Sequence, residues 1–386
     1  MASGEPLLMI PGPTNLPPEV RAALGGPGFY HRGPQMAELL ARCSAGLRDL
    51  MGLTGDVLIL TSSGTGAVEA VITNFLSPGD RVLAVLGGKF GERMGEIASA
   101  FGAEVRALAV EPGRAVRPDD LAAALAQAPC RAVLCVHNET STGVTHPIAE
   151  VAATAHAAGA LTIVDCVSCL GGVPVCADRW GLDVVAAGSQ KCLMLPPGLA
   201  FAGVRDEVWE ATADARMPRF YFDLRRARAA LRKGQTPYTP ATNLIAALAA
   251  ALDLIEAEGL ERVFARHRAM AEATRAAMRA GGLRLFAEEG SRSDTVTAVH
   301  SPAGIDSSEL VRLVRERHDV VISGGQDALK GRIFRIGHMG LVRLEQIERT
   351  LQAVADELTN LGYRCDAGAM LTAAHEAAQA AGTGAS

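Results

Sequence analysis

Lys191 follows an apolar stretch of the chain and a short turn. It follows the apolar run 184–187 and the turn-forming residues Gly188-Ser189-Gln190. A partly buried lysine at the end of a strand favours the neutral amine, which can form a Schiff base with a carbonyl group. From this segment alone a surface lysine after a strand is the commoner interpretation, so the prediction depends on the context of the motif.

Two further segments supply that context. Asp165 closes the apolar run 161–164, and a carboxylate there can keep the pyridine nitrogen of pyridoxal phosphate protonated, so that the ring becomes an electron sink. The segment Ser62-Ser63-Gly64-Thr65-Gly66-Ala67 follows the apolar run 57–60 and opens a helix-like stretch. Backbone N–H groups and hydroxyls at such a helix start can hold a phosphate. The three features together indicate a pyridoxal-phosphate site.

The motifs resemble, in kind and in order, those of class V aminotransferases of pyridoxal-phosphate fold type I, in the alanine/serine–glyoxylate (serine–pyruvate) branch. The resemblance implies an α/β fold, with a large domain built on a mostly parallel seven-stranded sheet between helices and a smaller α+β C-terminal domain. It extends from residue 11 to 340 and is carried by Pro11-Gly12-Pro13-Thr14, Ser63-Gly64-Thr65-Gly66-Ala67, Gly88-Lys89-Phe90-Gly91-Glu92-Arg93, Glu139-Thr140-Ser141-Thr142-Gly143, Val164-Asp165, Gly188-Ser189-Gln190-Lys191 and Phe334-Arg335-Ile336-Gly337.

The resemblance also implies pyridoxal 5′-phosphate as cofactor and a role for each residue of these motifs. Lys191 would hold the cofactor as a Schiff base and carry the transferred proton, while Asp165 would pair with the pyridine nitrogen. Phe90 would cover the pyridine face and Thr140 would approach the ring oxygen, with core packing and turn formation as their alternatives. The residues implied for phosphate binding are Ser63, Gly64, Thr65, Gly66 and Gln190.

In this family a segment of a partner subunit completes the phosphate site, and the segment 235–240 matches its place. A homodimer is therefore expected, with each active site completed across the interface. Animal members carry a tyrosine at the position of Gln235 and a threonine at that of Tyr238. The resemblance thus leaves open which of Gln235, Tyr238 and Thr239 contacts the phosphate.

Two cationic or titratable positions are candidates for substrate binding. Arg335 lies between apolar residues of a predicted strand, which directs its side chain inward, and a buried guanidinium requires an anionic partner. The α-carboxylate of a substrate would match its two-pronged geometry, and an internal salt bridge is the alternative. His31 is expected near the entrance of the active site.

Length and composition limit the class of protein. A chain of 386 residues with 49% hydrophobic and 20% charged residues is expected to fold into two closely packed domains. The formal charge of −5 gives no indication of nucleic-acid binding. No uninterrupted apolar run of membrane-spanning length and no signal pattern at Met1–Pro6 occur, so we expect a cytoplasmic protein without membrane attachment.

The eight cysteines lie mostly among apolar neighbours, as expected of reduced, buried thiols. Cys166 and Cys169 have the spacing of a redox or zinc motif. No second cysteine pair and no nearby histidine completes a tetrahedral site in the sequence, so no metal is expected.

Short apolar runs alternate with helix-like stretches from about residue 55 to 205, which is typical of βα units that form a mostly parallel sheet. The motifs fall just after the strands, at the carboxyl edge where open α/β sheets bind ligands. Predicted strands are Val57–Leu60, Arg81–Val85, Glu104–Leu108, Ala132–Val136, Leu161–Val164, Val184–Ala187 and Leu199–Val204, and predicted helices include Glu92–Ala103, Pro118–Ala128 and Ile148–Ala158.

The C-terminal third has a different pattern. It predicts one long helix over about 241–281, then strands near Thr295–Val299 and Ile333–Ile336 with a helix near Ser307–Arg317. The tail from Cys365 is rich in alanine and glycine and has little to bury, so we expect it to be frayed or loosely helical. The expected organisation is an N-terminal segment 1–20 packing on the small domain or on a partner, a large cofactor-binding domain 21–255, a small domain 256–364 and a tail 365–386.

The leading functional interpretation is an aminotransferase that moves an amino group from alanine or serine to glyoxylate or pyruvate, with aspartate or ureidoglycine as alternative donors. Cysteine desulfuration is less favoured because it needs a nucleophilic cysteine in the C-terminal part, and none occurs between residues 193 and 364. Fold alone does not exclude a non-catalytic subunit of a larger assembly, but such a subunit has no use for Lys191, Asp165 and Arg335 together. A dinucleotide-binding dehydrogenase would require a third glycine that the segment 63–69 lacks.

Overall fold

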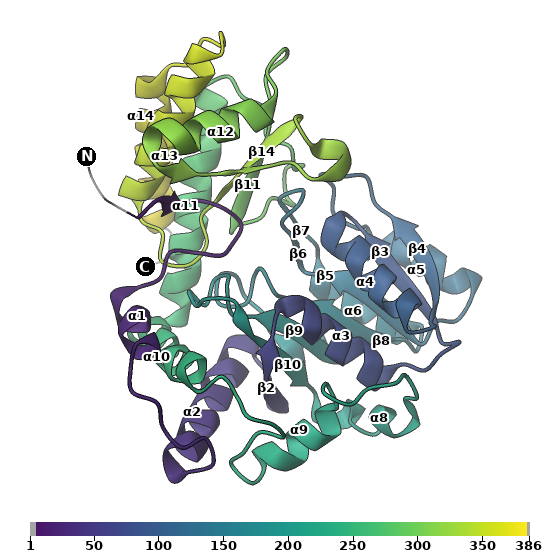
Figure 1. The fold of residues 1–386 in the computed structure, drawn as a ribbon. Coiled ribbons are helices and arrows are strands. Elements are labelled where there is room, and N and C mark those ends of the chain that lie inside the picture. Colours follow the sequence, from purple (N-terminus) through teal and green to yellow (C-terminus); the bar gives the residue numbers. More distant parts are fainter. Residues whose placement is uncertain (1–4, 384–386) are drawn as a thin grey trace.

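A seven-stranded sheet organises the larger part of the molecule. The computed structural model describes residues 5–383, and the sheet lies in the lower half of Figure 1 between two layers of helices. Its strand order is β2-β10-β9-β8-β5-β3-β4, and only β10 runs antiparallel to its neighbours. All seven predicted strands are confirmed: β2 (Asp56–Ser62), β3 (Arg81–Leu86), β4 (Glu104–Ala109), β5 (Ala132–Val136), β8 (Leu161–Asp165), β9 (Val184–Gly188) and β10 (Gly198–Val204).

The central strands are buried on both faces, which explains their nearly continuous apolar sequences. Every residue of β5 and of β9 is buried. Alternate residues of one strand enter two different cores: Val57 and Ile59 face one core, whereas Leu58 and Leu60 face the other. A sheet of this kind must be covered by helices on both sides.

The two helical layers do this. The core that contains Val57 is covered by α2 (Pro34–Met51), α5 (Pro118–Gln127), α6 (Ile148–Ala157), α7 (Ala177–Trp180) and α10 (Thr242–Glu258). The core that contains Leu58 is covered by α3 (Gly64–Phe75), α4 (Lys89–Ala100) and α9 (Leu224–Leu231). Smaller elements of this part are α1 (Pro18–Leu24), the hairpin strands β6 (Asn138–Glu139) and β7 (Val144–Thr145), η1 (Asp206–Val208) and α8 (Ala211–Asp214).

The smaller domain has a core of its own and occupies the upper half of Figure 1. Its antiparallel sheet has the order β11-β14-β13, and the N-terminal strand β1 (Leu7–Leu8) pairs in parallel with β12 (Val320–Val321) beside it. The remaining bounds are β11 (Val296–His300), β13 (Ser323–Gly324), β14 (Ile333–Gly337), α11 (Leu260–Ala280), α12 (Ser307–His318), η2 (Asp327–Leu329) and α13 (Leu344–Asn360). This arrangement is the predicted α+β unit; the residue limits assigned to the domains stay a prediction.

The prediction of one long helix over 241–281 is wrong. The structure has two helices there, α10 and α11, which are separated at Gly259. Gly259 adopts φ +86°, a conformation that glycine tolerates and that ends an α-helix. The break lets α10 remain on the sheet while α11 enters the smaller domain.

The tail from Cys365, expected to be frayed or loosely helical, is helical over the described residues but packed instead of loose. Residues 367–383 form the regular helix α14, which lies along α11 in Figure 1. Met370 and Ala374 are fully buried, and they share a core with Ala277 and Met278 of α11. Small side chains let two helices approach closely, so an alanine-rich helix can still bury a useful face. None of the described helices combines the length and the apolar character that crossing a membrane requires.

Candidate active site

A cavity opens where β2, β8 and β9 end, because these three strands run in the same direction and finish at the same edge of the sheet. The cavity lies on the side of the sheet that α3 and α4 cover. Its lining residues are Ser63, Gly64, Thr65, Val68, Phe90, Arg93, Met94, Asp165, Val167, Gln190 and Lys191. Seven of the residues predicted from the motifs are therefore brought together.

Lys191 lies three residues beyond β9 and is half-buried. Burial lowers the pKa of its amine to about 8, and the positive charges of Arg335 and Arg93 act in the same direction. Its Nζ donates a hydrogen bond to the carbonyl of Pro11. The N-terminal segment thus packs directly on the lysine, and a Cβ at Gly12, whose φ is +84°, would lie 2.5 Å from the lysine Cδ.

Asp165 is the last residue of β8 and only 6% of its surface is exposed. Its Oδ1 accepts a hydrogen bond of 2.8 Å from the backbone of Val167, yet burial still raises the pKa of the carboxyl to about 7. A buried carboxylate in this state gains most from a cation placed beside it. The protonated nitrogen of a pyridine ring is such a cation.

The start of α3 presents donors to the same cavity. Ser63 is the N-cap residue, but its side chain makes no capping hydrogen bond, so the first N–H groups of this twelve-residue helix are not satisfied by a cap. Gln190 adds a buried Oε1 that has no hydrogen-bond partner among residues 5–383. The unsatisfied N–H groups at the helix start suit an anion such as a phosphate, whereas the Gln190 oxygen is an acceptor and leaves only the amide NH2 group of that residue as a possible donor to it.

Phe90 is fixed by a buried glutamate that sequence analysis did not single out. Both Phe90 N and Gly91 N donate hydrogen bonds of 3.0 Å to Oε2 of Glu139, which thereby caps the N-terminus of α4. Its other oxygen accepts from the backbone N–H and the hydroxyl of Ser141. Burial raises the pKa of Glu139, and these hydrogen bonds oppose that shift. The only signal in the sequence was an acidic residue inside the Glu139-Thr140-Ser141 motif.

Arg335 is held by carbonyl groups and not by an acid. Its Nε and Nη2 donate to the carbonyl of Gly324 at 3.0 and 2.8 Å, and its Nη1 donates to the carbonyl of Thr140 at 2.8 Å. No carboxylate among residues 5–383 lies within ion-pair distance of the guanidinium, so the alternative of an internal salt bridge is not formed there. Burial lowers the pKa of Arg335 to about 10, which the charge of Glu139 counteracts.

Arg93 is a second cation that sequence analysis quoted but gave no role. It lines the cavity, and its Cζ lies 5.0 Å from the centroid of the Phe90 ring. This geometry is a cation–π contact that holds the ring and the guanidinium together. Thr140 and Gly66 are not lining residues: Thr140 contributes its carbonyl to Arg335, and a Cβ at Gly66 would collide with the Ser62 hydroxyl.

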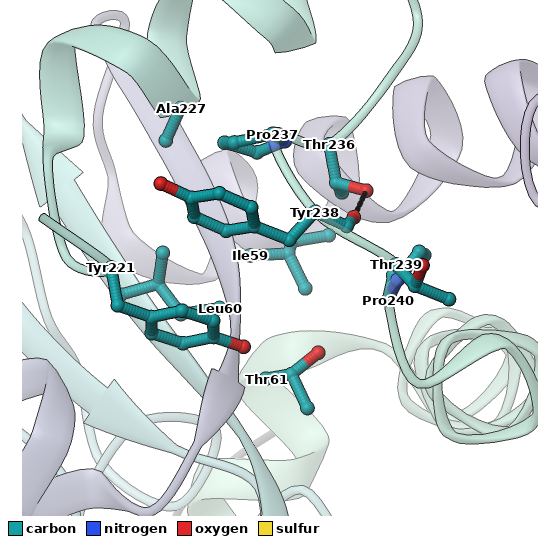
Figure 2. A pocket seen from close by; sticks show the side chains of 10 residues that line it. All are labelled: Ile59, Leu60, Thr61, Tyr221, Ala227, Thr236, Pro237, Tyr238, Thr239 and Pro240. Atoms are coloured by element: carbon teal, nitrogen blue, oxygen red, sulfur yellow. Dashed lines mark hydrogen bonds between the residues drawn. The ribbon is translucent and has the colours of Figure 1, made fainter.

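The structure does not bring Gln235, Tyr238 and Thr239 to this cavity within one chain. Tyr238 and Thr239 line a different pocket, shown in Figure 2, in which the rings of Tyr238 and Tyr221 stack at 5.1 Å. Gln235 accepts a hydrogen bond of 2.9 Å from Arg32. None of these residues lines the Lys191 cavity.

His31 is also separated from the cavity. It lies in the turn before α2, where it is half-buried and its ring meets that of Tyr30 edge-on at 5.5 Å. The structure therefore gives His31 no contact with the other predicted residues of the site.

The statement that no histidine lies near Cys166 and Cys169 is wrong for the folded chain. His137, one residue beyond β5, has its Nδ1 3.4 Å from Sγ of Cys169 and 3.9 Å from Sγ of Cys166. The histidine is 29 residues away in sequence from Cys166 and reaches it only through the pairing of β5 with β8.

We expect replacement of Lys191 by methionine to stabilise the protein, without added cofactor, at neutral pH. Below a folded-state pKa of about 8 the buried ammonium is penalised in full, and the penalty is lost as the pH rises from there to the unfolded value of 10.5. Urea unfolding should show a gain on the order of 1–3 kcal/mol at neutral pH that narrows above the folded pKa. Lys233→Met, at an exposed position, serves as control. If the difference in unfolding free energy between Lys191→Met and the wild type did not decrease above pH 8, the burial argument would be contradicted.

Comparison with known proteins agrees with this geometry. Residues 18–346 match the family described as "Aminotransferase class-V". The chain is 45% identical to the soluble hydrogenase small subunit of a Synechococcus strain, over 92% of this chain and 94% of that protein. It is 38% identical to the L-aspartate–glyoxylate aminotransferase of Paracoccus denitrificans, over 97% and 96%. It is 36% identical to the serine–glyoxylate aminotransferase of Methylorubrum extorquens, over 86% of each.

A solved structure extends the comparison to the fold. The pyridoxamine–pyruvate aminotransferase of Mesorhizobium loti superimposes with a TM-score of 0.94 at 31% identity, covering 98% of this chain and 99% of that one. Cysteine desulfurase structures at 15 and 18% identity share the fold alone. The chain belongs to the class V aminotransferase family and is an aminotransferase of fold type I.

Proposed function

We propose that the protein is a pyridoxal 5′-phosphate-dependent aminotransferase that moves an amino group from alanine or serine to glyoxylate or pyruvate. The observation that carries this proposal is the meeting of Lys191 and Asp165 in one cavity with the uncapped start of α3. The lysine amine, the carboxylate and the helix start suit a carbonyl, a pyridine nitrogen and a phosphate respectively. These are the three groups by which this cofactor is held.

The residues present fit the cofactor. Lys191 would anchor it covalently, Asp165 would pair with its ring nitrogen, and Ser63, Gly64, Thr65 and Gln190 would hold its phosphate. The Phe90 ring, fixed by Glu139, would cover its face. When bound, the cofactor supplies a carbonyl that condenses with amines and a ring that withdraws the electron pair left on the substrate Cα.

Three side chains of the protein would have separate roles in the reaction. The amine of Lys191, whose lowered pKa makes the neutral form more accessible than it is in an exposed lysine, would take the proton from the substrate Cα and return it. The carboxylate of Asp165 would stabilise a positive charge on the ring nitrogen of the cofactor. This charge favours withdrawal of the electron pair from the substrate Cα. Arg335 offers the buried cation that a substrate carboxylate needs, and its two carbonyl partners fix the plane of the guanidinium.

The donor is proposed from the chemistry of the site and from the relatives. Serine, aspartate and ureidoglycine are the donors named for three bacterial relatives, each with glyoxylate. The side chains of Phe90, Arg93 and Met94 line the cavity and limit its space, which favours a small donor. Aspartate and ureidoglycine stay the alternatives, and half-reaction rates decide among them.

A second candidate function, a non-catalytic subunit of a larger assembly, follows from the similarity to a hydrogenase subunit. A non-catalytic role gives no reason for burying Lys191, Asp165 and Arg335 without a close ion pair among residues 5–383, because such burial costs stability. Catalysis does give a reason, since the substrate and the cofactor bring the missing charges.

We further propose a cytoplasmic homodimer in which the segment 235–239 completes the site of the partner subunit. Tyr221, which lines the pocket of Figure 2, is 47% exposed, and Phe220, whose ring stacks on that of Tyr238, is 66% exposed. Large exposed aromatic side chains of this kind are typical of interfaces. Tyr238 stacks on Tyr221 and donates from its hydroxyl to the carbonyl of Phe220, so the segment is attached to this aromatic face.

The donor prediction uses the absorption of the bound cofactor. Purified protein should be yellow, and alanine or serine should bleach it faster than aspartate or ureidoglycine in the absence of an acceptor.

The Lys191→Ala variant should still bind the cofactor but lose turnover by at least ~10³-fold, because both the anchor and the proton carrier are gone. A wild type that binds no cofactor, or a Lys191→Ala variant that turns over normally, would refute the proposed enzyme.

Arg335 should determine carboxylate recognition. Replacement by alanine should cost on the order of 2–5 kcal/mol in kcat/KM for alanine and for glyoxylate, and lysine should rescue poorly because an ammonium lacks the planar fork. A simple amine donor without a carboxylate is the matched control. Equal losses for the amine and the amino acid would assign Arg335 a structural role.

Completion of the site across the interface predicts complementation. The Lys191→Ala chain and a Gln235→Ala/Tyr238→Ala/Thr239→Ala chain should each be inactive, whereas mixed dimers from co-expression should recover one good site in two. At equal expression this is roughly a quarter of wild-type activity. Mixed dimers without activity, or an active monomer in sedimentation, would exclude a shared site.

A further inference from the structure

A buried cluster of two thiols and one imidazole lies behind the strand that carries Asp165. Cys166 and Cys169 are fully buried and His137 is 4% exposed. Nδ1 of the histidine and the two sulfur atoms all lie within 4.8 Å of one another. The aminotransferase chemistry uses none of these side chains.

The spacing of the three atoms fits a single metal ion. Bond lengths of about 2.3 Å to sulfur and 2.0 Å to nitrogen at a tetrahedral zinc place a sulfur and a nitrogen about 3.5 Å apart. The two distances in the structure are 3.4 and 3.9 Å. The cluster therefore has ligand spacing before any rearrangement.

The backbone around the cluster is fixed independently of the side chains. The N–H of His137 donates to the carbonyl of Asp165 at 2.9 Å, and that of Cys166 donates to the carbonyl of Ala186 at 2.7 Å. The N–H of Cys169 closes a turn on the carbonyl of Cys166 at 3.2 Å, which places both sulfur atoms on one side. Such preorganisation is what a metal site needs in order to bind without refolding.

A surface cavity reaches the histidine of the cluster. His137 lines a surface cavity of 420 Å³ together with Trp180, Thr145 and His146. Trp180 meets the imidazole edge-on, with ring centroids 5.8 Å apart, and so orients it. The cavity reaches the histidine of the cluster but neither cysteine, so an ion, and water as a fourth ligand, would have to enter past His137.

We propose that His137, Cys166 and Cys169 bind a thiophilic divalent cation of the zinc type. Binding releases two thiol protons to solvent, and two thiolates, a neutral imidazole and a dication form a complex of zero net charge. A neutral complex is the state that a fully buried site tolerates best. The ion would join the ends of β5 and β8 and hold the strand end from which Asp165 projects to the opposite side of the sheet.

The probe for the site is Co²⁺, added to the reduced, chelator-treated full-length protein without oxygen. One equivalent per chain should give a thiolate-to-cobalt charge-transfer band and the intense visible bands of a four-coordinate site, and Zn²⁺ should displace it. Cys166→Ser, Cys169→Ser and His137→Asn should each weaken binding by at least ~100-fold. Cys43→Ser, which alters another buried cysteine in α2, should leave the spectrum unchanged.

Three outcomes would overturn the proposal. They are the absence of a thiolate band in the wild type, a band that survives in both cysteine variants, and a Cys166–Cys169 disulfide in fresh protein that binds no cobalt once reduced. Circular dichroism checks the fold of each variant, and Cys166→Ala with Cys169→Ala replaces the serine variants if those do not fold. The wild-type titration needs no variant and decides the first outcome by itself.

Discussion

The structure depends on the burial of three charged groups that form no ion pair with another side chain among residues 5–383. Lys191, Asp165 and Arg335 approach one region from β9, β8 and β14, and burial moves the pKa of each towards its neutral form. A fold accepts this cost where a ligand supplies the missing charges. The sheet, the two helical layers and the smaller domain are the scaffold that keeps the three groups near one another and away from water.

Glu139 connects these parts. Its carboxylate holds the start of α4 and hence the Phe90 ring, while the carbonyl of the next residue, Thr140, accepts from Arg335 of the smaller domain. A second link across the same gap is the ion pair between Lys89 and Asp327, 3.1 Å apart, but it is exposed and therefore weaker. The buried hydrogen bonds set the geometry between the aromatic ring and the arginine.

The sheet was predictable from the sequence, whereas contacts between distant segments were not. Strands buried on both faces have continuous apolar sequences, and motifs at their ends must meet at one edge, so the cavity followed from the strand assignment. The break at Gly259 was missed because apolar periodicity continues on both sides of it. The packing of α14 was missed because an alanine-rich sequence does not reveal the partner, here α11, against which the helix is buried.

The contact of His137 with Cys166 is a further example of a contact between distant segments that the sequence alone did not predict. Val136 pairs with Asp165 in the parallel register of β5 and β8, so the next residues of the two strands, His137 and Cys166, become neighbours. Because side chains alternate along a strand, Asp165 enters the cavity beside Lys191 while Cys166 enters the core on the other side. One strand end thus places Asp165 in the cavity and Cys166 in the proposed metal cluster, and a change in register by one residue would exchange the faces on which the two side chains lie.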